Sequence, residues 1–228
     1  MSKVVLFGLR DFASLAHYYL KYDSPHEVVA FTVDREFVPD QPTFEGCPVV
    51  AFDDLENCYP PDEFSAFAPL SHQGMNRMRR DVYARFKQKG YELISYVSSH
   101  ATCFPGTPIG DNCLILEDNT IQPFVRIGNN VVLWSGNHIG HHSTIEDHVF
   151  FTSHVVLSGH CHVEESCFFG VNATVRDGLR IGKETLVGMG AVVGRDTEPR
   201  SVHKGNSSKP SGMSSLDVDF TRPARVAG

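Results

Sequence analysis

The chain has 228 residues, of which 41% are hydrophobic and 21% charged, a composition typical of one or two globular domains. Its formal net charge of -7 argues against a nucleic-acid or anionic-membrane partner, because both favour a basic surface. The one basic cluster, Arg77, Arg79 and Arg80, is interpreted as a solvated turn of a helix.

The apolar run in the N-terminal MSKVVLFGLRDF is shorter than a signal peptide requires, and no run approaches the roughly 20 apolar residues of a membrane span. The six cysteines, at positions 47, 58, 103, 113, 161 and 167, form no C-x-x-C pair. We therefore expect reduced thiols, no membrane insertion and a cytoplasmic location.

Residues 1 to 97 alternate apolar runs with helical patterns. Strands are predicted at KVVLFG, EVVAFTVD, PVVAF, FSAFAPL and ELISYVS, and helices over about 11–21 and 76–89. This order predicts a small parallel sheet with helices packed on it, which makes residues 1–98 a Rossmann-like α/β domain. Ligands of such sheets bind at the carboxyl ends of the strands, here at 8–12, 34–35 and 71–73.

From Ile109 onward, every sixth residue is a large aliphatic residue or Phe. The positions are Ile109, Ile115, Ile121, Ile127, Leu133, Ile139, Ile145, Phe151, Leu157, Val163, Phe169, Val175, Ile181, Val187 and Val193. A period of six predicts a parallel β-helix, in which three blocks form one triangular coil of 18 residues and the sixfold position fills the interior. We expect this β-helix over 99–200, followed by a loop and tail over 201–228.

Three cysteines have a place in this repeat. Cys113, Cys161 and Cys167 occupy the fifth position of their blocks, where other blocks carry small or β-branched residues. A free cysteine most often behaves as a small buried hydrophobe. We therefore predict buried structural thiols at these three positions.

The stretch from His138 to His154 carries five of the twelve histidines. In a coil of 18 residues, positions 18 apart stack at the ~4.8 Å spacing of neighbouring strands. His142, His148, His154 and His160 hold the fourth place of successive blocks, so only His142 and His160 share a column. A metal site needs several converging ligands, and two are too few, so no metal is expected.

Most of these histidines are interpreted as turn or interface residues, namely His148, His154, His160 and His162. His141 differs, because it follows Gly140 and has Gly159 beneath it in the next coil. Its ring is therefore expected to face an open groove. A neutral imidazole with a pKa of about 6.5 suits a general base at neutral pH.

The α/β region followed by repeats with NHIGHHSTI, GVNATVRDG and IGKETLVGMGAVV resembles the left-handed β-helix sugar acyltransferases over about residues 3 to 210. Members of this family that the chain resembles include bacterial N-acetyltransferases of nucleotide-linked amino sugars, such as those of bacillosamine and perosamine. The resemblance implies a left-handed β-helix and acetyl-CoA as acyl donor. It also implies a homotrimer with the acceptor site between subunits, and a role in surface-polysaccharide biosynthesis such as that of O-antigen.

The family's catalytic histidine lies in the motif I-x-H-[ED], which Ile139-Gly140-His141 matches. The resemblance therefore implies that His141 takes the proton from the sugar amine while the amine attacks the thioester. His142 stands where the family has a carboxylate, so the second catalytic position is altered. The group that orients His141 stays open among Glu146, Asp147 and an acid of a neighbouring subunit.

Carried through the same register, the resemblance places the acetyl-CoA groove along Phe150, Val171 and Met189, with the Gly159 N–H on the thioester carbonyl and Lys209 near a CoA phosphate. It places the nucleotide-sugar site at Arg10, Asp11, Phe12, Asp34, Arg35 and Ser71. The glycine-rich turn that the family has there is reduced to Gly8, which leaves nucleotide binding open.

The γ-class carbonic anhydrases also resemble this repeat and hold metal between subunits with histidines two coils apart. Two coils after His138, His141 and His142 this chain has Thr174, Asp177 and Gly178. An N-acetyltransferase is therefore the leading interpretation. An O-acetyltransferase, a non-catalytic hexapeptide-repeat scaffold and a metal-dependent hydratase remain as alternatives. Trp134, Phe150 and Phe168 are expected on flat faces where subunits meet.

Overall fold

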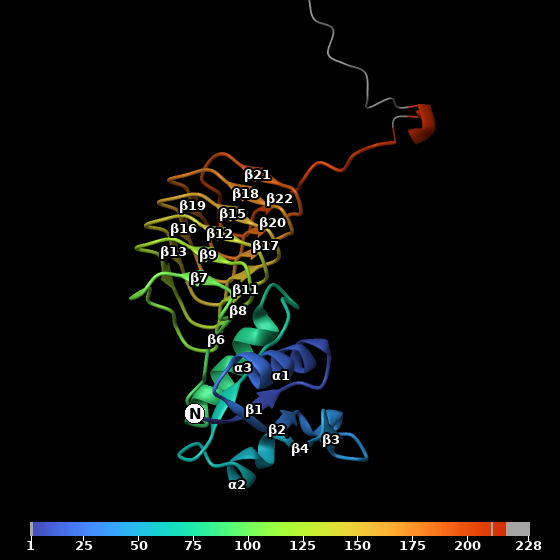
Figure 1. The fold of residues 1–228 in the computed structure, drawn as a ribbon, viewed down its shortest axis with the longest axis vertical. Helices are drawn as coiled ribbons and strands as arrows, with labels where there is room; N and C mark the ends of the chain where they lie inside the picture. The colour runs from blue at the N-terminus through green and yellow to red at the C-terminus, as the bar shows by residue number, and fades with distance from the viewer. Residues whose placement is uncertain (1, 211, 218–228) are drawn as a thin grey trace, which may run out of the picture.

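A computed structural model describes residues 2–210 and 212–217, which form an α/β domain and a stack of coils that rises from it (Figure 1). The α/β sheet has the strand order β3-β4-β2-β1-β5. Its strands are β1 (Lys3–Phe7), β2 (Glu27–Val33), β3 (Thr43–Phe44), β4 (Cys47–Ala51) and β5 (Ser65–Phe67). The pairs are parallel, as predicted, except for an antiparallel β3–β4 hairpin, which the predicted elements did not include.

The helices cover both faces of this sheet. They are α1 (Asp11–Asp23), α2 (Leu55–Cys58) and α3 (Arg77–Gln88), and 3-10 turns lie at Arg35–Phe37, Phe52–Asp54 and Ser215–Asp217. Successive residues of a strand point to opposite faces, so Val4 and Leu6 pack with α1 whereas Val5 and Phe7 pack with α2 and α3. Helix α1 therefore lies between the sheet and the coils.

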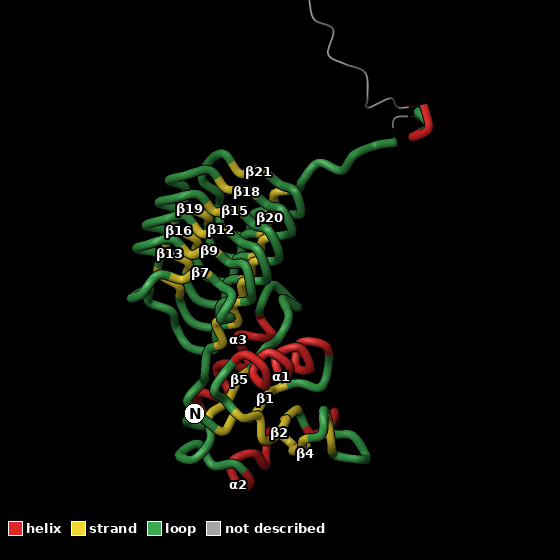
Figure 2. Tube along the Cα trace, in the orientation of Figure 1, coloured by secondary structure: helices red, strands yellow, loops and turns green. Residues whose placement is uncertain are grey.

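The coils form a parallel β-helix of three sheets, as the period of six predicts. Figure 2 shows its short strands separated by turns, with the α-helices confined to the α/β domain. Paired strands are 18 residues apart, for example His138↔Val156 and Phe150↔Phe168. Of the sixfold positions, Ile109 is partly buried and all later ones are buried in one continuous core.

The three sheets of the β-helix present different outer surfaces. The domain sheet is β6 (Tyr96–Val97), β8 (Leu114–Ile115), β11 (Val132–Leu133), β14 (Phe150–Phe151), β17 (Phe168–Phe169), β20 (Leu186–Val187) and β22 (Val202–His203). The open sheet is β7 (Thr102–Cys103), β9 (Thr120–Ile121), β12 (His138–Ile139), β15 (Val156–Leu157), β18 (Thr174–Val175) and β21 (Val192–Val193). The charged sheet is β10 (Arg126–Ile127), β13 (Thr144–Ile145), β16 (His162–Val163) and β19 (Arg180–Ile181).

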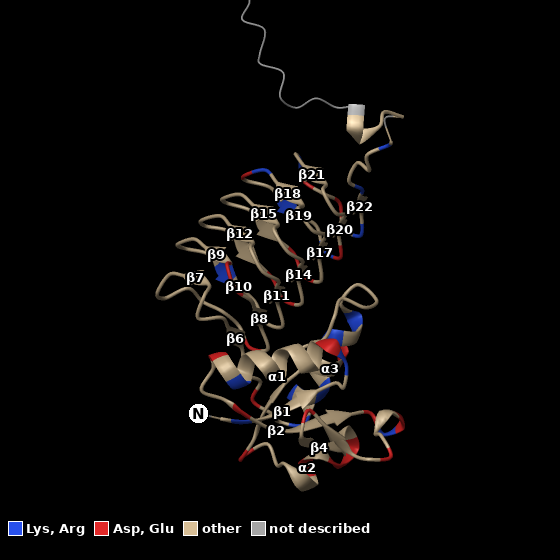
Figure 3. Cartoon of the chain, turned by 45° about the vertical axis from the view of Figure 1, so that its right-hand side comes forward, with Lys and Arg blue, Asp and Glu red and all other residues tan. Residues whose placement is uncertain are grey.

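The first residue of each of these strands faces outward. On the domain sheet these residues are all apolar, on the open sheet they are Thr, Val and His, and on the charged sheet Arg126 and Arg180 are exposed (Figure 3). Because β6 and β22 pair with β8 and β20, the β-helix extends beyond the expected bounds of 99–200. The predicted strand ELISYVS is divided, since Leu93 bridges to Ala66 of the α/β sheet while β6 joins the β-helix.

The fourth place of the repeat blocks that begin at Ile109 through Val187 is a corner with positive φ. The residues there have φ of 54 to 78° and are Asn112, Asp118, Phe124, Asn130, Gly136, His142, His148, His154, His160, Ser166, Asn172, Gly178, Glu184 and Gly190. Gly, Asn, Asp and His tolerate this left-handed conformation better than other residues. The recurrence of histidine at this place therefore has a backbone reason, as the turn interpretation of the sequence anticipated.

The fifth place of each block points into the interior. Cys113, Cys161 and Cys167 are buried there, as predicted, and burial raises the pKa of both Cys113 and Cys167 to about 12. Polar residues at the same place are tied to the backbone, as when Asn119 Nδ2 donates to the carbonyl oxygens of Leu116 and Trp134 at 2.8 Å. These thiols therefore serve packing.

Two predictions fail where the domains meet. Phe150 is 1% exposed and packs against Phe12 of α1, while Trp134 meets the same Phe12 ring edge-on at 5.3 Å, and Phe168 belongs to the same cluster. These aromatic side chains therefore cover the junction between the two domains, and they do not form a flat face for a second subunit. A sequence pattern cannot tell these two uses of an apolar face apart.

The second failure concerns Arg79, which is fully buried although the basic cluster predicts a solvated turn. Its Nη1 donates to the carbonyl and side-chain oxygens of Asn130, and its Nη2 donates to the carbonyl oxygen of His148 at 2.8 Å. Burial lowers the pKa of this guanidinium. The side chain therefore links α3 to two successive corners of the β-helix.

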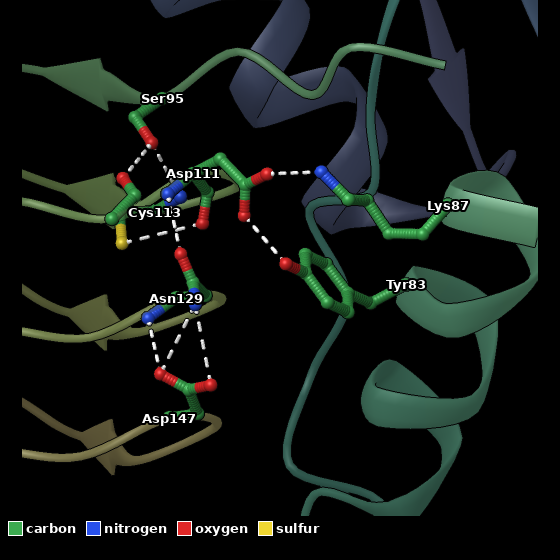
Figure 4. A network of polar contacts seen from close by, with 8 residues as sticks. Tyr83, Lys87, Ser95, Asp111, Cys113, Asn129 and Asp147 are labelled. Atoms are coloured by element: carbon green, nitrogen blue, oxygen red, sulfur yellow. Dashed lines mark hydrogen bonds and ion pairs between the residues drawn. The ribbon is translucent and has the colours of Figure 1, made fainter. Parts of the chain in front are cut away.

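A surface network continues the same contact (Figure 4). Tyr83 Oη and Lys87 Nζ of α3 each donate to Asp111 at 2.7 Å. The Asp111 N–H donates to Asn129 Oδ1 at 3.0 Å, and the Asn129 N–H donates to Asp147 Oδ1 at 2.7 Å. Across the part of the chain that the structure describes, no helix combines the length and apolar character needed to cross a bilayer.

Candidate functional site

Three histidines and a glycine meet at one corner of the β-helix, between the open sheet and the charged sheet. We define His141, His142, Gly159 and His160 as the histidine corner. His141 and His142 follow β12, and Gly159 and His160 follow β15, the strand that pairs with β12 one coil later. The three imidazoles are exposed. The corner is therefore a surface feature with its functional groups directed to solvent.

The backbone explains why these side chains converge. His142 and His160 hold fourth-place positions with φ of 59 and 58°, so they stack, with ring centroids 4.8 Å apart and an interplanar angle of 14°. The His160 N–H donates to the His141 carbonyl oxygen at 2.8 Å, and the His141 N–H donates to Gln122 Oε1 at 2.9 Å. Phe124 extends the column on the other side of His142 at 4.6 Å.

Gly159 lies directly against the His141 ring, as the register predicts. A Cβ at this position would lie 2.9 to 3.2 Å from three ring atoms of His141. A Cβ on Gly140 would overlap the backbone of Ser158 and Gly159. Both glycines are therefore required by close approach, and the one at 159 leaves room for the imidazole.

The Gly159 N–H donates no hydrogen bond within the described structure. It is therefore a free donor. At the same place of other blocks the N–H groups of His141, Glu165 and Lys183 donate to side chains one coil earlier, those of Gln122, Glu146 and Glu164. A buried or ligand-facing N–H without a protein partner is a donor for a bound molecule. This free N–H belongs to the residue whose Cα side faces the His141 ring.

His142 is within hydrogen-bond distance of the His141 ring, with 3.1 Å between the two Nδ1 atoms. Of the acids considered from the sequence, Glu146 bonds to His162 Nε2 at 2.6 Å and Asp147 accepts the Asn129 N–H (Figure 4). Neither of them contacts His141. In the neutral pair one Nδ1 donates and the other accepts, so a donating His141 Nδ1 leaves its Nε2 lone pair free.

The expectation that only His142 and His160 converge is wrong. Among the described residues, one ring nitrogen each of His141, His142 and His160 lies within 4.8 Å of the other two. Because His141 holds the third place of its block, it was expected to stack with the third-place residues of other coils and not with His142 and His160. In the structure its ring turns back to contact both neighbours, with its centroid 5.2 Å from that of His142 and 4.9 Å from that of His160.

The residues expected along an acetyl-CoA groove do not all lie at this corner. Val171 and Met189 are exposed at the opposite edge of the open sheet, where the domain sheet turns into it. Gly205 approaches the Met189 carbonyl so closely that a Cβ would overlap it, which ties the segment leading to the exposed Lys209 to the same edge. Phe150, in the junction between the domains, lines no open groove.

The residues expected at a nucleotide-sugar site follow neighbouring strands at one edge of the α/β sheet, because the order there is β2-β1-β5. Arg10 and Asp11 are exposed at the start of α1, and Ser71 is half-buried. The others are engaged within the protein: Phe12 packs on Trp134, Asp34 pairs with Arg85 at 2.5 Å, and Arg35 pairs with Asp54 at 3.0 Å.

His72 is a further candidate within the range 71–73, beside Ser71, the residue of that range that was expected to bind substrate. Its ring centroid lies 4.5 Å from that of Phe168 and 5.2 Å from that of Phe150, at the seam between the domains. Burial, and then the charge of Arg79, lower the pKa of His72. The signal that singles it out in the sequence is its place just after the last strand of the parallel sheet.

Two hollows on the described surface are lined by residues other than those of the histidine corner. One is lined by Arg126, Gly128, Thr144, Glu146, Asp147 and Glu165 on the charged sheet. Another follows α1, along Asp11, His17, Tyr18, Lys21 and Tyr22. The three imidazoles of the histidine corner are exposed to solvent in the single chain.

Comparison with known proteins identifies the repeat. Residues 106–140 and 125–159 match the model of the bacterial transferase hexapeptide (six repeats), and residues 162–195 match the hexapeptide repeat of succinyl-transferase. No curated protein sequence matches the chain significantly. The repeat region of this chain therefore matches the hexapeptide repeats of bacterial transferases.

Solved structures share the whole fold. The acetyltransferase domain of PglB from Neisseria gonorrhoeae FA1090, also solved in complex with acetyl coenzyme A, has a TM-score of 0.80 at 22% identity and covers 92% of this chain and 100% of its own. PerB from Caulobacter crescentus, in complex with CoA and GDP-perosamine, has a TM-score of 0.76 at 23% identity over 90% of this chain and 95% of its own. WeeI from Acinetobacter baumannii AYE has a TM-score of 0.74 at 20% identity over 89% and 96%.

Proposed function

From the premise that residues 106–195 carry the hexapeptide repeats of bacterial transferases, we propose that this chain is an acetyl-CoA-dependent N-acetyltransferase. Its acceptor would be the amino group of a nucleotide-linked amino sugar in cytoplasmic surface-polysaccharide biosynthesis, such as that of O-antigen. The observation that carries the proposal is the exposed imidazole of His141 lying against Gly159, whose N–H donates no hydrogen bond within the described structure. A base and a candidate oxyanion donor therefore belong to residues in contact.

The chemistry requires both groups. The sugar amine attacks the thioester carbonyl carbon, the C–S bond breaks, and CoA leaves as a thiolate. His141 takes the proton that the amine loses and passes it to the thiolate. The Gly159 N–H donates to the carbonyl oxygen while it carries negative charge, a contact worth roughly 2.7 to 4 kcal/mol in other acyl-transfer enzymes.

His142 replaces the carboxylate that the family motif carries beside its base. With 3.1 Å between the Nδ1 atoms, its acceptance of the His141 Nδ1 proton would keep the Nε2 of His141 unprotonated. Stacking against His160 and Phe124 holds the His142 ring in place. We therefore assign His142 the orienting role.

The chain's residues fit an acyl-CoA donor only if two copies meet. His141 and Gly159 lie at one edge of the open sheet, whereas Val171, Met189 and the segment that leads to Lys209 lie at the other. A groove lined by both sets forms when the edge of one copy faces the opposite edge of the next, as in a closed trimer. The outer Thr and Val residues of the open sheet carry no charge that would oppose such packing.

PglB and PerB support the donor and acceptor classes, because they share the fold and were solved with acetyl coenzyme A, and with CoA and GDP-perosamine. Arg10, Asp11 and Ser71, with His72 beside them in the chain, are the candidates for contacting the nucleotide part of the acceptor. Phe12, Asp34 and Arg35 would have to exchange their present contacts for the ligand.

The test is the rate of acetyl transfer by His141→Ala with GDP-perosamine and related nucleotide-linked amino sugars. We expect turnover to be abolished and acetyl-CoA binding to stay within a few-fold, because the imidazole moves a proton and does not hold the donor. His162→Ala, on the charged sheet and outside both halves of the proposed groove, is the control and should retain activity. Full activity of His141→Ala would contradict the assignment.

The product distinguishes the class of acceptor. An amide product survives mild alkali, whereas an ester is hydrolysed, and mass spectrometry reads the difference. Loss of the acetyl group under mild alkali would identify an O-acetyltransferase and overturn the N-acetyltransferase proposal.

A further inference from the structure

The histidine corner has the donor set of a transition-metal site. His141, His142 and His160 each present a ring nitrogen within 4.8 Å of the other two, and all three imidazoles are exposed. Imidazole nitrogen is a common ligand of Zn²⁺, and three protein ligands plus one solvent molecule make a frequent tetrahedral arrangement. The fourth position at this corner faces solvent.

The separations suit one shared ion. With zinc–nitrogen bonds of about 2.0 to 2.1 Å and tetrahedral angles, two ligating nitrogens lie roughly 3.3 Å apart. The Nδ1 atoms of His141 and His142 are already 3.1 Å apart. His160 reaches the same point by rotation of its exposed ring, which now stacks on that of His142 at 4.8 Å.

The backbone holds the three ligands in place before any ion binds. His142 and His160 occupy equivalent corners of successive coils, and β12 and β15, which precede them, are paired in register. The hydrogen bond from the His160 N–H to the His141 carbonyl oxygen closes the remaining distance between the coils. Binding of the ion therefore has to order only the side-chain rotations of the three histidines. The smaller loss of conformational entropy favours affinity.

We propose that the histidine corner binds a divalent transition-metal ion through His141, His142 and His160, and that the bound ion inhibits acetyl transfer. The binding half stands on the geometry alone, and the inhibition half rests on the proposed function. A neutral imidazole has one nitrogen with a lone pair and one with a proton. When the metal takes the lone pair of His141, neither nitrogen can accept the proton of the sugar amine.

Binding is tested by calorimetric titration of ZnCl₂ into the chelator-treated full chain. We expect one ion per histidine corner, weakened in His142→Asn and in His160→Asn by at least the roughly 10- to 100-fold that loss of an outer-shell partner costs a metal site. Asn tolerates the left-handed backbone of both positions, so the corner keeps its shape. His154→Asn makes the same change at another corner and should bind zinc as the parent does.

A second probe reports the ligands directly. Co²⁺ in a tetrahedral site with nitrogen ligands absorbs in the visible, and this band should appear in the parent and in His154→Asn but fall away in the two corner variants. Equal zinc affinity and equal cobalt spectra in all four proteins would overturn the site.

The inhibition half is measured as the ZnCl₂ concentration that halves acetyl transfer, each variant being compared with its own metal-free rate. We expect that concentration to rise at least about 10-fold in His160→Asn, and a chelator to restore the rate of the parent. If zinc binds and the rate of acetyl transfer is unchanged, the proposed inhibition is wrong, whereas the proposed metal site at the histidine corner is supported. If the metal-free parent transfers no acetyl group, the proposed function fails and calorimetry still decides the site.

Discussion

The histidines of the histidine corner differ in whether the backbone conformation explains their position. The histidines at the fourth place meet a backbone demand, because that place has positive φ in every coil. His141 holds the third place, so no such demand explains it, and its ring lies on the bare surface that Gly159 leaves. A residue that the backbone does not require is the better candidate for chemistry.

Gly159→Ala tests whether that bare surface matters. The new methyl group would lie 2.9 to 3.2 Å from the His141 ring and displace it, so we expect kcat to fall by about 10-fold or more with little change in Tm. Gly159 has ordinary negative φ, so its backbone tolerates alanine. The matched control is Gly194→Ala, which has open space around its Cβ and should keep both activity and Tm. Equal loss of activity in both variants would argue against a specific contact.

Among the elements, the three corners of the β-helix are built alike but used differently. The corner between the charged sheet and the domain sheet forms a buried ladder: Asn112 Nδ2 donates to Asn130 Oδ1 at 2.8 Å, and Asn130 Nδ2 donates to His148 Nδ1 at 2.9 Å. The corner between the open and charged sheets is exposed and carries the candidate chemistry. The same turn therefore serves packing where the α/β domain covers it, and it leaves the candidate site exposed where the domain does not cover it.

The ladder predicts a pH dependence of stability. Burial, and then the charge of Arg79, lower the pKa of His148 from 6.5 to about 4. Between these two pH values His148 is protonated in the unfolded chain but neutral in the folded chain. The free energy of unfolding should therefore fall as the pH drops from about 6.5 to about 4, by at most roughly 3 kcal/mol. Above pH 6.5 this contribution is fully present.

Urea unfolding at a series of pH values measures this slope. His148→Asn keeps a polar side chain suited to the left-handed corner and removes the titrating group, so the slope in this pH range should become shallower. An unchanged slope in that variant would assign the pH dependence to other groups.

At the scale of the whole molecule, the outer surface of the domain sheet decides how the two halves join. Leu114, Val132 and Phe150 pack into the same core as α1, so the β-helix and the α/β sheet share one buried cluster. Arg79 completes the junction by donating to carbonyl oxygens of two corners. The two domains are therefore predicted to unfold together.

Arg79→Met tests this junction. The change leaves the carbonyl oxygens of Asn130 and His148 without their donor in a closed interface, which we expect to cost about 3 kcal/mol and to lower Tm. Arg80→Met is the control, because Arg80 pairs with the adjacent Asp81 at the surface and should change Tm little. A Tm equal to that of the parent in Arg79→Met would show that apolar packing alone holds the junction.

The open sheet predicts the assembly. Its two edges carry the separate halves of the proposed donor groove, so we expect a trimer in solution, measured by light scattering with in-line chromatography. Val156→Lys and Val192→Lys place charges on the exposed outer surface of this sheet. Both should weaken assembly and acetyl transfer together. A monomeric parent with full activity would contradict the shared groove.

The local sequence by itself determined the β-helix, its 18-residue coil, the buried cysteines and the parallel α/β sheet. A sixfold apolar period buries its apolar residues in the interior of a β-helix, and alternating strands and helices bury theirs between a parallel sheet and its helices. It also placed Gly159 beneath His141. Only the tertiary structure decided that Arg79 is buried, that Phe150 belongs to the domain junction and that His141 joins His142 and His160. Periodicity specifies which way a residue points, whereas burial and convergence depend on what a distant segment places opposite it.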